Sequence, residues 1–363
     1  MPDTPCVIIN TGKMHRNIEK LAGISRKYGV SLRPHMKTHK IPAIAKRQIA
    51  AGACGITAAK ISEAEVMAAH GINDIFIAYP LVAESKIERL IALSRRVRVI
   101  AGVDGAEGAA KLAELAKRRQ ATVEVRLEVD TGLQRTGVRY DDAVGLARKI
   151  AALPQLRLRG IYTFRGAFMN GQSTLDARQA GLEEGRMMVE LAERIRAVGI
   201  EIPDVSVGST PTSAYAAEVD GVTEIRPGTY VFYDRMQAAL NACTLDDCAA
   251  AVRVTVVSRP AEDRIVIDGG SKTFATDVAP GVAPLYLQGF GHIVEAPHAV
   301  IERLSEEHGM VRIAKGDAFG PGDVLHVIPN HICSTINLHN KVYFRESNGE
   351  FKERQVIARG MVY

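Results

Sequence analysis

The spacing of hydrophobic and polar positions divides the chain into two regions. From about residue 31 to 230, short runs rich in β-branched residues alternate with longer segments whose apolar positions recur every three or four residues. This alternation is typical of parallel βα units. Eight such units predict an α/β fold, a closed (β/α)8 TIM-type barrel. The predicted strands are 31–34, 55–57, 74–78, 97–103, 122–129, 157–162, 204–207 and 223–226.

Helical segments fill the intervals between these strands. Segments 62–70, 106–119 and 182–198 carry an apolar stripe at three- and four-residue steps. Ser62 and Glu65 have the spacing of a capping box, which predicts where the first of these helices begins. A further helix is expected to begin near Pro211.

After about residue 240 the pattern changes to β-rich runs separated by turn residues. The runs are 250–258, 264–270, 323–329, 341–344 and 354–363, with no long helical segment between them. We therefore predict a barrel domain over residues 11–240 and a β domain over residues 241–363. The opening strand, 6–9, precedes the first helix, and residues 1–10 are expected to contribute this strand to the β domain.

Composition and charge narrow the classes of function. The 363 residues include 46 Lys and Arg against 41 Asp and Glu, a small excess spread along the chain, so no nucleic-acid partner is expected. No run approaches the ~20 apolar residues of a membrane helix, and no secretory signal opens the chain. The five cysteines are scattered and odd in number, which argues against a disulfide framework. A cytoplasmic protein without membrane contact is expected.

Reactive side chains in a barrel lie in loops after the strands, and three of these loops stand out. RPHMKTHK follows the first strand, and a lysine among cations is suited to Schiff-base chemistry, although a solvated basic loop is the simpler interpretation of this segment alone. GSTPTS and RPGT follow the seventh and eighth strands, where barrels commonly bind phosphate. GSTPTS alone is equally typical of an ordinary strand-to-helix turn. Together the three loops predict an aldehyde cofactor that carries a phosphate.

Five separated motifs add a resemblance to a known family. RPHMKTHK, VDTGLQRTG, EIRPGTYVFYD, LSEEHG and PNHICSTINLH resemble the D-threonine aldolase and D-serine dehydratase family, whose barrel is similar to that of alanine racemase. The resemblance covers essentially the whole chain. It implies fold type III binding of pyridoxal 5'-phosphate, a small D-amino acid as substrate, and commonly a homodimer.

The resemblance also implies roles for individual residues. Lys37 would form the internal aldimine, Arg135 would lie near the phenolic oxygen of the cofactor, and Arg226 would face its pyridine nitrogen. Tyr162 would also lie at the cofactor. The phosphate would be bound by Gly208, Ser209, Thr210, Gly228 and Thr229, with Tyr230 nearby.

His331 and Cys333 form a candidate metal site in the β domain. In an extended segment, residues two apart face the same side, so the imidazole and the thiolate could bind one soft divalent cation. The residues alone favour a buried cysteine beside a surface histidine, whereas the resemblance favours a metal. Zinc is the expected ion, with Mn²⁺ or Mg²⁺ as alternatives.

Arg165 departs from the family pattern, which often has a histidine or an aromatic residue in this segment. It is expected to be a solvated charge at the barrel rim or, alternatively, a ligand for a substrate carboxylate. The predicted activity is a lyase acting on D-3-hydroxy amino acids. A dehydratase of the D-serine or D-3-hydroxyaspartate type is favoured, because H-x-C resembles the dehydratase branch. Retro-aldol cleavage to glycine and an aldehyde, racemisation and a non-enzymatic cofactor carrier are the alternatives.

Overall fold

In the computed structural model, which describes residues 1–169 and 171–363, the chain forms two compact units. We call them the barrel unit and the sheet unit. The chain passes from the barrel unit to the sheet unit directly after Lys37 and again directly after Gly228. The barrel unit comprises Lys20–Lys37, Pro42–Gly228 and Met361–Tyr363, and the sheet unit comprises Met1–Glu19, Thr38–Ile41 and Thr229–Gly360.

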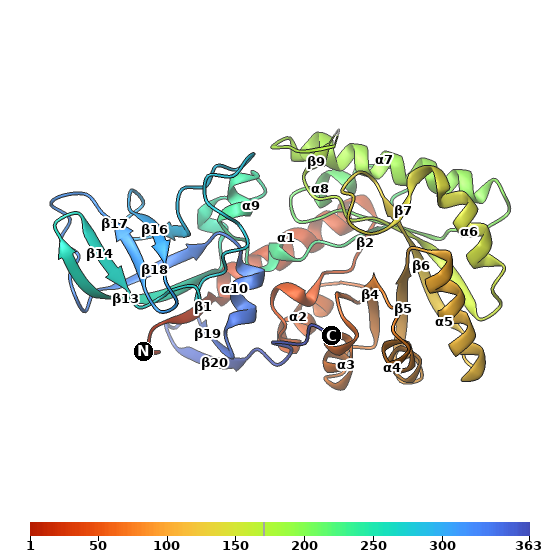
Figure 1. Ribbon diagram of the computed structural model, residues 1–363, viewed down its shortest axis with the longest axis horizontal. Coiled ribbons are helices and arrows are strands. Elements are labelled where there is room, and N and C mark those ends of the chain that lie inside the picture. The colour runs from red at the N-terminus through yellow and green to blue at the C-terminus, as the bar shows by residue number, and fades with distance from the viewer. Residues whose placement is uncertain (170) are drawn as a thin grey trace. The chain divides into compact units, whose positions relative to one another are not determined.

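The barrel unit contains eight parallel strands that close on themselves (Figure 1). Hydrogen bonds from the Cys54 N–H to the Leu32 carbonyl, at 2.9 Å, and from the Thr57 N–H to the Pro34 carbonyl, at 2.8 Å, join the first strand to the last. All eight predicted strands are present, and the predicted fold class is confirmed. In spatial order they are β2 (Ser31–Leu32), β12 (Glu224–Ile225), β11 (Asp204–Val207), β8 (Leu156–Tyr162), β6 (Val123–Asp130), β5 (Arg98–Val103), β4 (Asp74–Pro80) and β3 (Ile56–Ala58).

Helices connect these strands, and their apolar stripes face the strands. The three predicted helices are present as α3, α5 and α7, and shorter pairings extend three of the loops. The helices are α2 (Pro42–Ala50), α3 (Ile61–Ala69), α4 (Glu84–Ser94), α5 (Ala106–Arg118), α6 (Ala143–Ala151), α7 (Ala177–Arg196) and α8 (Ser213–Ala216). The added elements are β7 (Val138–Arg139), β9 (Phe168–Met169), β10 (Gln172–Ser173), and the 3₁₀ turns η1 (Met36–Thr38) and η2 (Tyr140–Asp142).

The predicted capping box of α3 is wrong by two residues. The helix follows Lys60, and the Glu63 carboxylate accepts from the Lys60 N–H at 3.3 Å. Glu63 is buried and can therefore reach the unpaired N–H groups of the first turn, whereas Glu65 is turned outward and pairs with Arg89 at 2.5 Å. The Ser62 hydroxyl donates to the carbonyl of Tyr363 instead.

A tightly packed pair of aromatic rings lies in the barrel core. Phe76 and Tyr162 meet edge to face, with ring centroids 4.8 Å apart. A methyl group at position 102 would lie 2.3 Å from the Tyr162 hydroxyl, so the β5 residue Gly102 provides the room that this phenol occupies. The Tyr162 side chain therefore belongs to the packed interior of the barrel.

The sheet unit is built on one large mixed sheet. Strand β1 (Cys6–Asn10) lies between β13 (Ala250–Ala261), to which it is antiparallel, and β19 (Lys341–Arg345), to which it is parallel, so the opening strand does join the C-terminal part. The remaining strands are β14 (Arg264–Ile267), β15 (Gly291–Ile293), β16 (Val300–Leu304), β17 (Gly309–Arg312), β18 (Val324–Pro329) and β20 (Phe351–Gln355). Helix α1 (Thr11–Tyr28) begins in this unit and passes into the barrel unit after Glu19. The other helical elements are η3 (Thr229–Val231), α9 (Arg235–Ala239), η4 (Leu245–Asp247) and α10 (Ile332–Leu338).

Two details of the predicted β domain differ from the structure. The run 354–363 was expected to be β-rich, but β20 ends at Gln355 and the chain then turns. The reason is local, since Val356 donates to Asn340 rather than extending the ladder, and Ala358 donates to Lys40. Strands β15 to β17 lie in a region where no run was predicted, because they are short and two of them contain charged residues.

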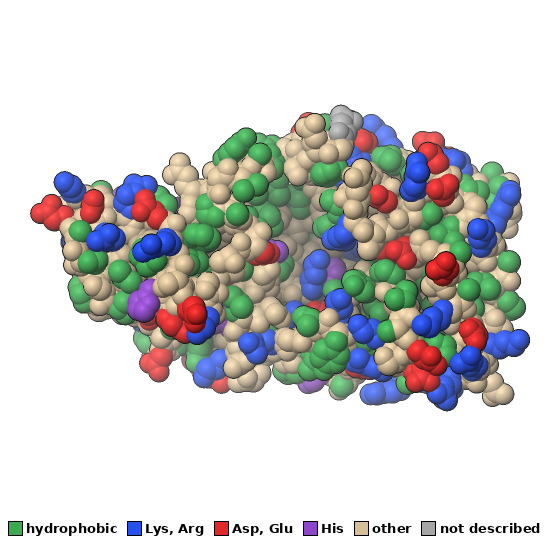
Figure 2. Space-filling model, in the orientation of Figure 1, with side chains coloured by type: hydrophobic (Ala, Val, Ile, Leu, Met, Phe, Trp, Pro, Cys, Tyr) green, Lys and Arg blue, Asp and Glu red, His purple; other side chains and the backbone are tan. Residues whose placement is uncertain are grey.

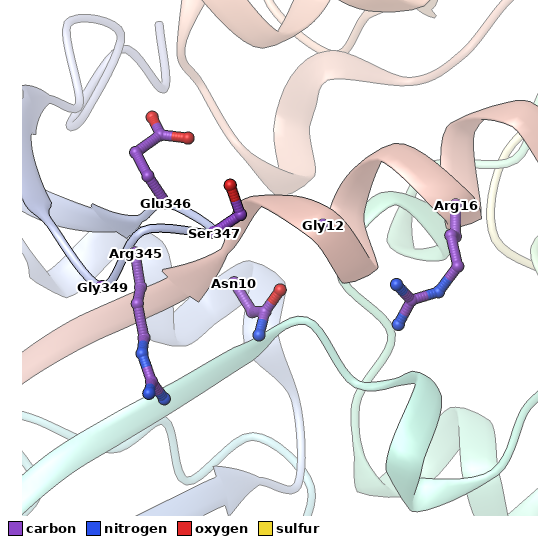
Figure 3. A pocket seen from close by; sticks show the side chains of 7 residues that line it. All are labelled: Asn10, Gly12, Arg16, Arg345, Glu346, Ser347 and Gly349. Carbon is purple, nitrogen blue, oxygen red and sulfur yellow. The ribbon is translucent and has the colours of Figure 1, made fainter.

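The surface features of each unit are modest. On the face drawn in Figure 2, acidic and basic side chains are interspersed, in keeping with the small net charge of +5. None of the helices among residues 1–169 and 171–363 has the length and apolar character needed to cross a bilayer. A cleft of about 350 Å³ opens at the start of α1 in the sheet unit and is lined mainly by exposed residues (Figure 3). Its lining residues are Asn10, Gly12, Arg16, Arg345, Glu346, Ser347 and Gly349.

Candidate active site

The segment RPHMKTHK forms a buried turn rather than the solvated loop that its charges alone suggested. Arg33, His35 and Lys40 are buried. Arg33 pairs with carboxylates from other strands, and the backbone of Lys40 is left-handed, with φ of 55°. Lys37 is only half-buried. Of the two lysines, Lys37 is therefore the one that belongs to the barrel unit and keeps access to solvent.

Backbone contacts hold this turn beside the R-P-G turn that follows β12. The His35 N–H donates to the Pro227 carbonyl at 3.0 Å, and the Lys37 N–H donates to His35 Nδ1 at 3.3 Å. Two motifs that are about 190 residues apart in the sequence thus meet because β2 and β12 are neighbours in the sheet.

One aromatic ring brings two predicted cofactor residues together. Lys37 Nζ lies 5.5 Å from the centre of the Phe164 ring, and the Arg135 guanidinium lies 4.9 Å from the same centre. Phe164 follows β8, whereas Arg135 lies in the loop after β6. A methyl group on Gly137 would lie 2.6 Å from the Asp130 backbone nitrogen, so the V-D-T-G-L-Q-R-T-G loop needs glycine to fold back on its own strand.

Arg226 lies inside the barrel with only part of its guanidinium engaged. Its Nε donates to the Ser206 hydroxyl at 2.7 Å, and Nη2 donates to the Thr163 carbonyl. Its Nη1 has no hydrogen-bond partner among residues 1–169 and 171–363. Burial lowers the pKa of Arg226, and the guanidinium stands 5.2 Å from the Tyr162 ring. The group is therefore positioned with one donor edge available.

Tyr162 is placed beneath this arginine rather than at an open surface. Its hydroxyl donates to Glu128 at 3.0 Å, and the Thr136 hydroxyl donates to the other oxygen of the same carboxylate at 2.8 Å. Burial, followed by the charge of Glu128, holds the pKa of Tyr162 well above its usual value. Tyr162 stays a neutral phenol, and a direct contact with the cofactor remains a prediction.

The G-S-T segment after β11 forms a narrow turn at the entry to α8. Gly208 has φ of 84°, and a methyl group there would lie 3.0 Å from Ser213 Cα. Ser209 closes the turn, since its N–H donates to the Thr212 hydroxyl at 3.0 Å and its carbonyl accepts from the Ser213 N–H at 2.8 Å. The Ser209 N–H is thus bonded within the turn, and it is the hydroxyl groups of the turn that can donate to an anion. The turn is therefore suited to a phosphate.

Most of the remaining predicted phosphate residues lie where the chain passes from the barrel unit to the sheet unit. Gly228 is the last residue of the barrel unit before the crossing, and Thr229 begins the sheet unit. Within the sheet unit the Thr229 hydroxyl lies 3.4 Å from Cys333 Sγ, and Tyr230 is fully buried. Roles for these residues and for Thr210 in phosphate binding stay predictions.

The predicted metal pair lies at the start of a helix, not in an extended strand as expected. His331 is the extended residue that precedes α10, and Cys333 is in its first turn. In the first turn of this helix the Thr335 hydroxyl donates to the His331 carbonyl at 2.9 Å. The two side chains nevertheless interact. Although burial opposes its charged form, Cys333 and Asp277 raise the pKa of His331 to about 11. Despite its burial, the Cys333 thiol has its pKa lowered by His331.

Two carboxylates that the sequence analysis missed hold this pair. Asp277 accepts from His331 Nδ1 at 2.6 Å and from the Ser334 hydroxyl at 2.8 Å. Asp234 is fully buried and accepts from the backbone N–H of Ile332, between the two candidate ligands, at 3.0 Å. Within the part of the chain that the structure describes, no three or more His, Cys, Asp and Glu side chains gather as a metal site. A cation bound here would have two protein ligands.

Arg165 is buried, and the expectation of a solvated rim charge is wrong. The guanidinium is turned inward because three groups on one side receive its donors. Nε donates to the Phe168 carbonyl at 2.5 Å, Nη1 to Met187 Sδ at 3.4 Å and Nη2 to Glu183 at 2.7 Å. A role in binding the substrate stays a prediction.

Comparison with known proteins agrees with this arrangement. Residues 9–236 match the family model for the N-terminal domain of alanine racemase, and residues 249–345 match a serine dehydratase domain. The chain is 35% identical to a D-threo-3-hydroxyaspartate dehydratase from Delftia sp. (strain HT23), over 92% of this chain and 91% of that protein. The chain belongs to the D-threonine aldolase and D-serine dehydratase family. Members of this family are pyridoxal-phosphate-dependent lyases.

Two further proteins are similar to this chain. A D-threonine aldolase from Arthrobacter sp. is 30% identical over 93% of this chain and 88% of that protein. A solved D-threo-3-hydroxyaspartate dehydratase, a cysteine-to-alanine variant in its metal-free form, superposes with a TM-score of 0.90 at 31% identity. That alignment covers 98% of this chain and 97% of the solved chain. The predicted family and fold are therefore confirmed.

Proposed function

We propose that this protein is a pyridoxal-phosphate- and metal-dependent dehydratase of small D-3-hydroxy amino acids, of the D-serine or D-3-hydroxyaspartate type. One observation carries the proposal. The chain combines a half-buried lysine near the R-P-G turn with a His-x-Cys pair of soft donors held by one buried carboxylate, Asp234, and one exposed carboxylate, Asp277. The dehydratase from Delftia and the metal-free solved relative support this assignment.

The barrel residues fit the cofactor by their chemistry. Lys37 would bind its aldehyde carbon, the turn of Gly208 and Ser209 would hold its phosphate, and the open Nη1 edge of Arg226 would donate to its ring nitrogen. Because an arginine donates hydrogen bonds but accepts none, Arg226 would leave that nitrogen in its acceptor form. When bound, the cofactor withdraws electrons from the α-carbon of the substrate and weakens the bonds there.

The reaction requires this chain to move one proton and to assist one leaving group. Lys37 Nζ, once the substrate amine has taken its place on the cofactor, is the base that removes the α-proton. The product enamine then decays to a keto acid and ammonia. His331 and Cys333 would hold a divalent ion, zinc by the softness of their nitrogen and sulfur donors, and this ion would supply Lewis-acid assistance at the β-hydroxyl.

Retro-aldol cleavage is the second candidate, and the relative named D-threonine aldolase favours it. The same cation at the β-oxygen would assist loss of the hydroxyl proton, and glycine and an aldehyde would result. We favour dehydration because cysteine, not aspartate, is the second donor here. Racemisation would leave the donor pair without a role.

A product assay tests the proposal. The protein is incubated with D- and L-enantiomers of serine, threonine, phenylserine and 3-hydroxyaspartate, while ammonia, glycine and aldehyde are quantified separately. Ammonia and keto acid in equal amounts from D-substrates alone are expected. Glycine with aldehyde would establish the aldolase, and racemised substrate without either product would rule out a lyase. The homodimer and the cytoplasmic location stay predictions.

Chelation followed by zinc addition tests the metal. Turnover should stop without metal and return with zinc, whereas the absorbance of the lysine-bound cofactor should persist throughout. Cys333→Ala should behave like the chelated protein but recover poorly, since it has lost one of two protein ligands. Undiminished product formation by the metal-free protein would make His331 and Cys333 structural.

A further inference from the structure

Helix α7 carries one carboxyl group on its buried face, next to the turn of Gly208–Thr212, which we call the phosphate turn. Glu184 is fully buried between two glycines of the same helix face. A methyl group on Gly181 would lie 2.6 Å from the Thr212 carbonyl oxygen, and one on Gly185 would lie 2.8 Å from Val219. The helix backbone therefore approaches the turn closely, and Glu184 is the side chain that this approach brings to it.

A chain of hydroxyl groups connects Glu184 with the turn. Glu184 Oε2 lies 3.4 Å from the Thr212 hydroxyl, which lies 2.9 Å from the Ser209 hydroxyl. The Thr212 oxygen also accepts from the Ser209 N–H at 3.0 Å. Glu184 Oε1, although buried, has no hydrogen-bond partner among residues 1–169 and 171–363.

The protonation state of Glu184 decides the direction of this chain, because each hydroxyl has one proton to donate. When Glu184 is ionised, Thr212 donates to it and Ser209 donates to Thr212, so Ser209 turns lone pairs toward an incoming phosphate. When Glu184 is protonated, it donates to Thr212 and Thr212 donates to Ser209. The Ser209 hydroxyl is then left as a donor for the phosphate.

We propose that Glu184 is a positioning residue that takes up a proton when the cofactor phosphate binds and thereby makes Ser209 a donor. The proposal rests on the proposed cofactor site. Arg226 and Arg165 are the charged groups that face Glu184 from the neighbouring loops, and backbone N–H groups of Gly208 and Arg165 also favour its ionised form. Burial outweighs all of these and raises the pKa of Glu184 to about 7. The switch therefore operates near neutral pH.

The affinity for the cofactor, measured from pH 6.0 to 8.5, tests this proposal. If binding requires Glu184 to take up a proton, the affinity of the wild type for the cofactor falls as the pH rises through about 7. One linked proton lowers this affinity about tenfold per pH unit above that point. In Glu184→Gln the amide N–H₂ donates to Thr212 at every pH, so the loss attributable to Glu184 should disappear. Titration of the phosphate itself affects both proteins equally and cancels in their ratio.

Pyridoxal, which lacks the phosphate, is the control ligand. Glu184→Gln should leave the dissociation constant of pyridoxal unchanged. Thr212→Val removes the middle hydroxyl, so its affinity for the phosphorylated cofactor should lose the same pH dependence that Glu184→Gln loses. The same pH dependence in wild type and Glu184→Gln would overturn the proposal, as would equal changes for pyridoxal. If borohydride reduction of the wild type labelled no lysine in the barrel unit, the proposed cofactor site would be wrong as well.

Discussion

The two ends of the barrel use buried cations in opposite ways. At the amino ends of the strands, Arg33 pairs with Glu224 at 2.7 Å and Arg126 pairs with Asp204 at 3.0 Å. The acidic partners are the first residues of their strands, so the barrel base is closed by ion pairs. At the carboxyl ends, the buried Arg226 donates to a hydroxyl and to a carbonyl oxygen, whereas the half-buried Lys37 and the exposed Arg135 contact an aromatic ring.

This difference shows which charges the protein satisfies by itself. Although burial opposes ionisation, Arg126 and Arg33 hold the pKa of Glu224 well below its usual value. Arg226 is as deeply buried, yet no carboxylate of the described residues forms a salt bridge with it, and burial lowers its pKa. A cation that is fully paired stabilises the barrel, whereas one with an open donor edge is available to an anionic ligand. Substitutions at the two ends should therefore affect different properties.

Lys37→Ala should have the largest effect, and on activity alone. The variant loses both the covalent link to the cofactor and the base at the α-carbon, so kcat should fall about 10³-fold or more. Its free energy of unfolding without cofactor should change by about 1 kcal/mol or less, the size of a partly exposed contact between a cation and an aromatic ring.

Lys60→Ala is the matched control for that prediction. Lys60 Nζ lies 3.7 Å from the centre of the Tyr79 ring, so this lysine is also a cation on an aromatic ring after a barrel strand. Borohydride reduction and peptide mapping should find the pyridoxyl group on Lys37 in this variant and in the wild type. Label on Lys40 or Lys60 would contradict the assignment.

Glu224→Gln should do the reverse, with its main effect on stability, although the Ser206 hydroxyl to which Arg226 Nε donates itself donates to Glu224 at 2.7 Å. Removing this carboxylate leaves Arg33 and Arg126 with uncompensated buried charge, which costs about 3–5 kcal/mol. Urea unfolding measures the loss, and Glu65→Gln is the control, because the half-buried Glu65–Arg89 pair at the surface should contribute about 1 kcal/mol or less. If both variants lost the same free energy of unfolding, the buried ion pairs at the amino ends of the strands would contribute no more than the surface pair.

The pH dependence of Glu224→Gln follows from the direction of the pKa shift. Because the folded-state pKa of Glu224 lies below its unfolded value, its stabilising contribution is fully present above about pH 4.3 and is lost as the pH falls toward the folded value. Wild type should therefore lose more stability than the variant between about pH 5 and 2. Parallel acid-denaturation curves would contradict this account.

The sequence predicts much of the barrel but little of the base. The eight strands and the family motifs are visible because short apolar periods and local spacing define them. The burial of RPHMKTHK is not visible, since it depends on carboxylates such as Glu224, 191 residues away from Arg33. Helix α10 was missed because its seven residues, ICSTINL, include three β-branched ones and have no recognisable helical period.

Glu184 shows what a closer reading could have found. It lies on the apolar stripe of the predicted helix 182–198, four residues before Met188, and an acidic residue at such a position is buried and needs partners. Asp277 offered no comparable signal. It lies in a loop 54 residues before His331, and only the folded sheet unit brings the two together.

Asp277→Asn should have an intermediate effect, and it tests whether carboxylate pairing is always structural. The carboxylate fixes the His331 ring through Nδ1 and raises its basicity as a ligand, so its loss should weaken zinc binding about 10–100-fold. Asp317→Asn is the control, since Asp317 pairs with the exposed His298 at 2.8 Å and no metal is predicted there. Zinc titration against a competing chelator measures both. An unchanged affinity in Asp277→Asn would assign this pair to stability.

Arg165→Lys should have the smallest effect, because Arg165 combines the two kinds of cation. Like the cations of the base it is buried and paired, here with Glu183, but it follows a strand at the mouth and its planar fork could receive a second substrate carboxylate. Lysine keeps the charge and loses the fork, so kcat/KM should fall about fivefold more for D-3-hydroxyaspartate than for D-serine, roughly 1 kcal/mol. Glu183→Gln removes the competing carboxylate and should shift the ratio the opposite way. If kcat/KM fell by the same factor for both substrates in Arg165→Lys, the guanidinium would only support the loop after β8. Arg165 would then be a structural cation, like Arg33 and Arg126 at the amino ends of the strands.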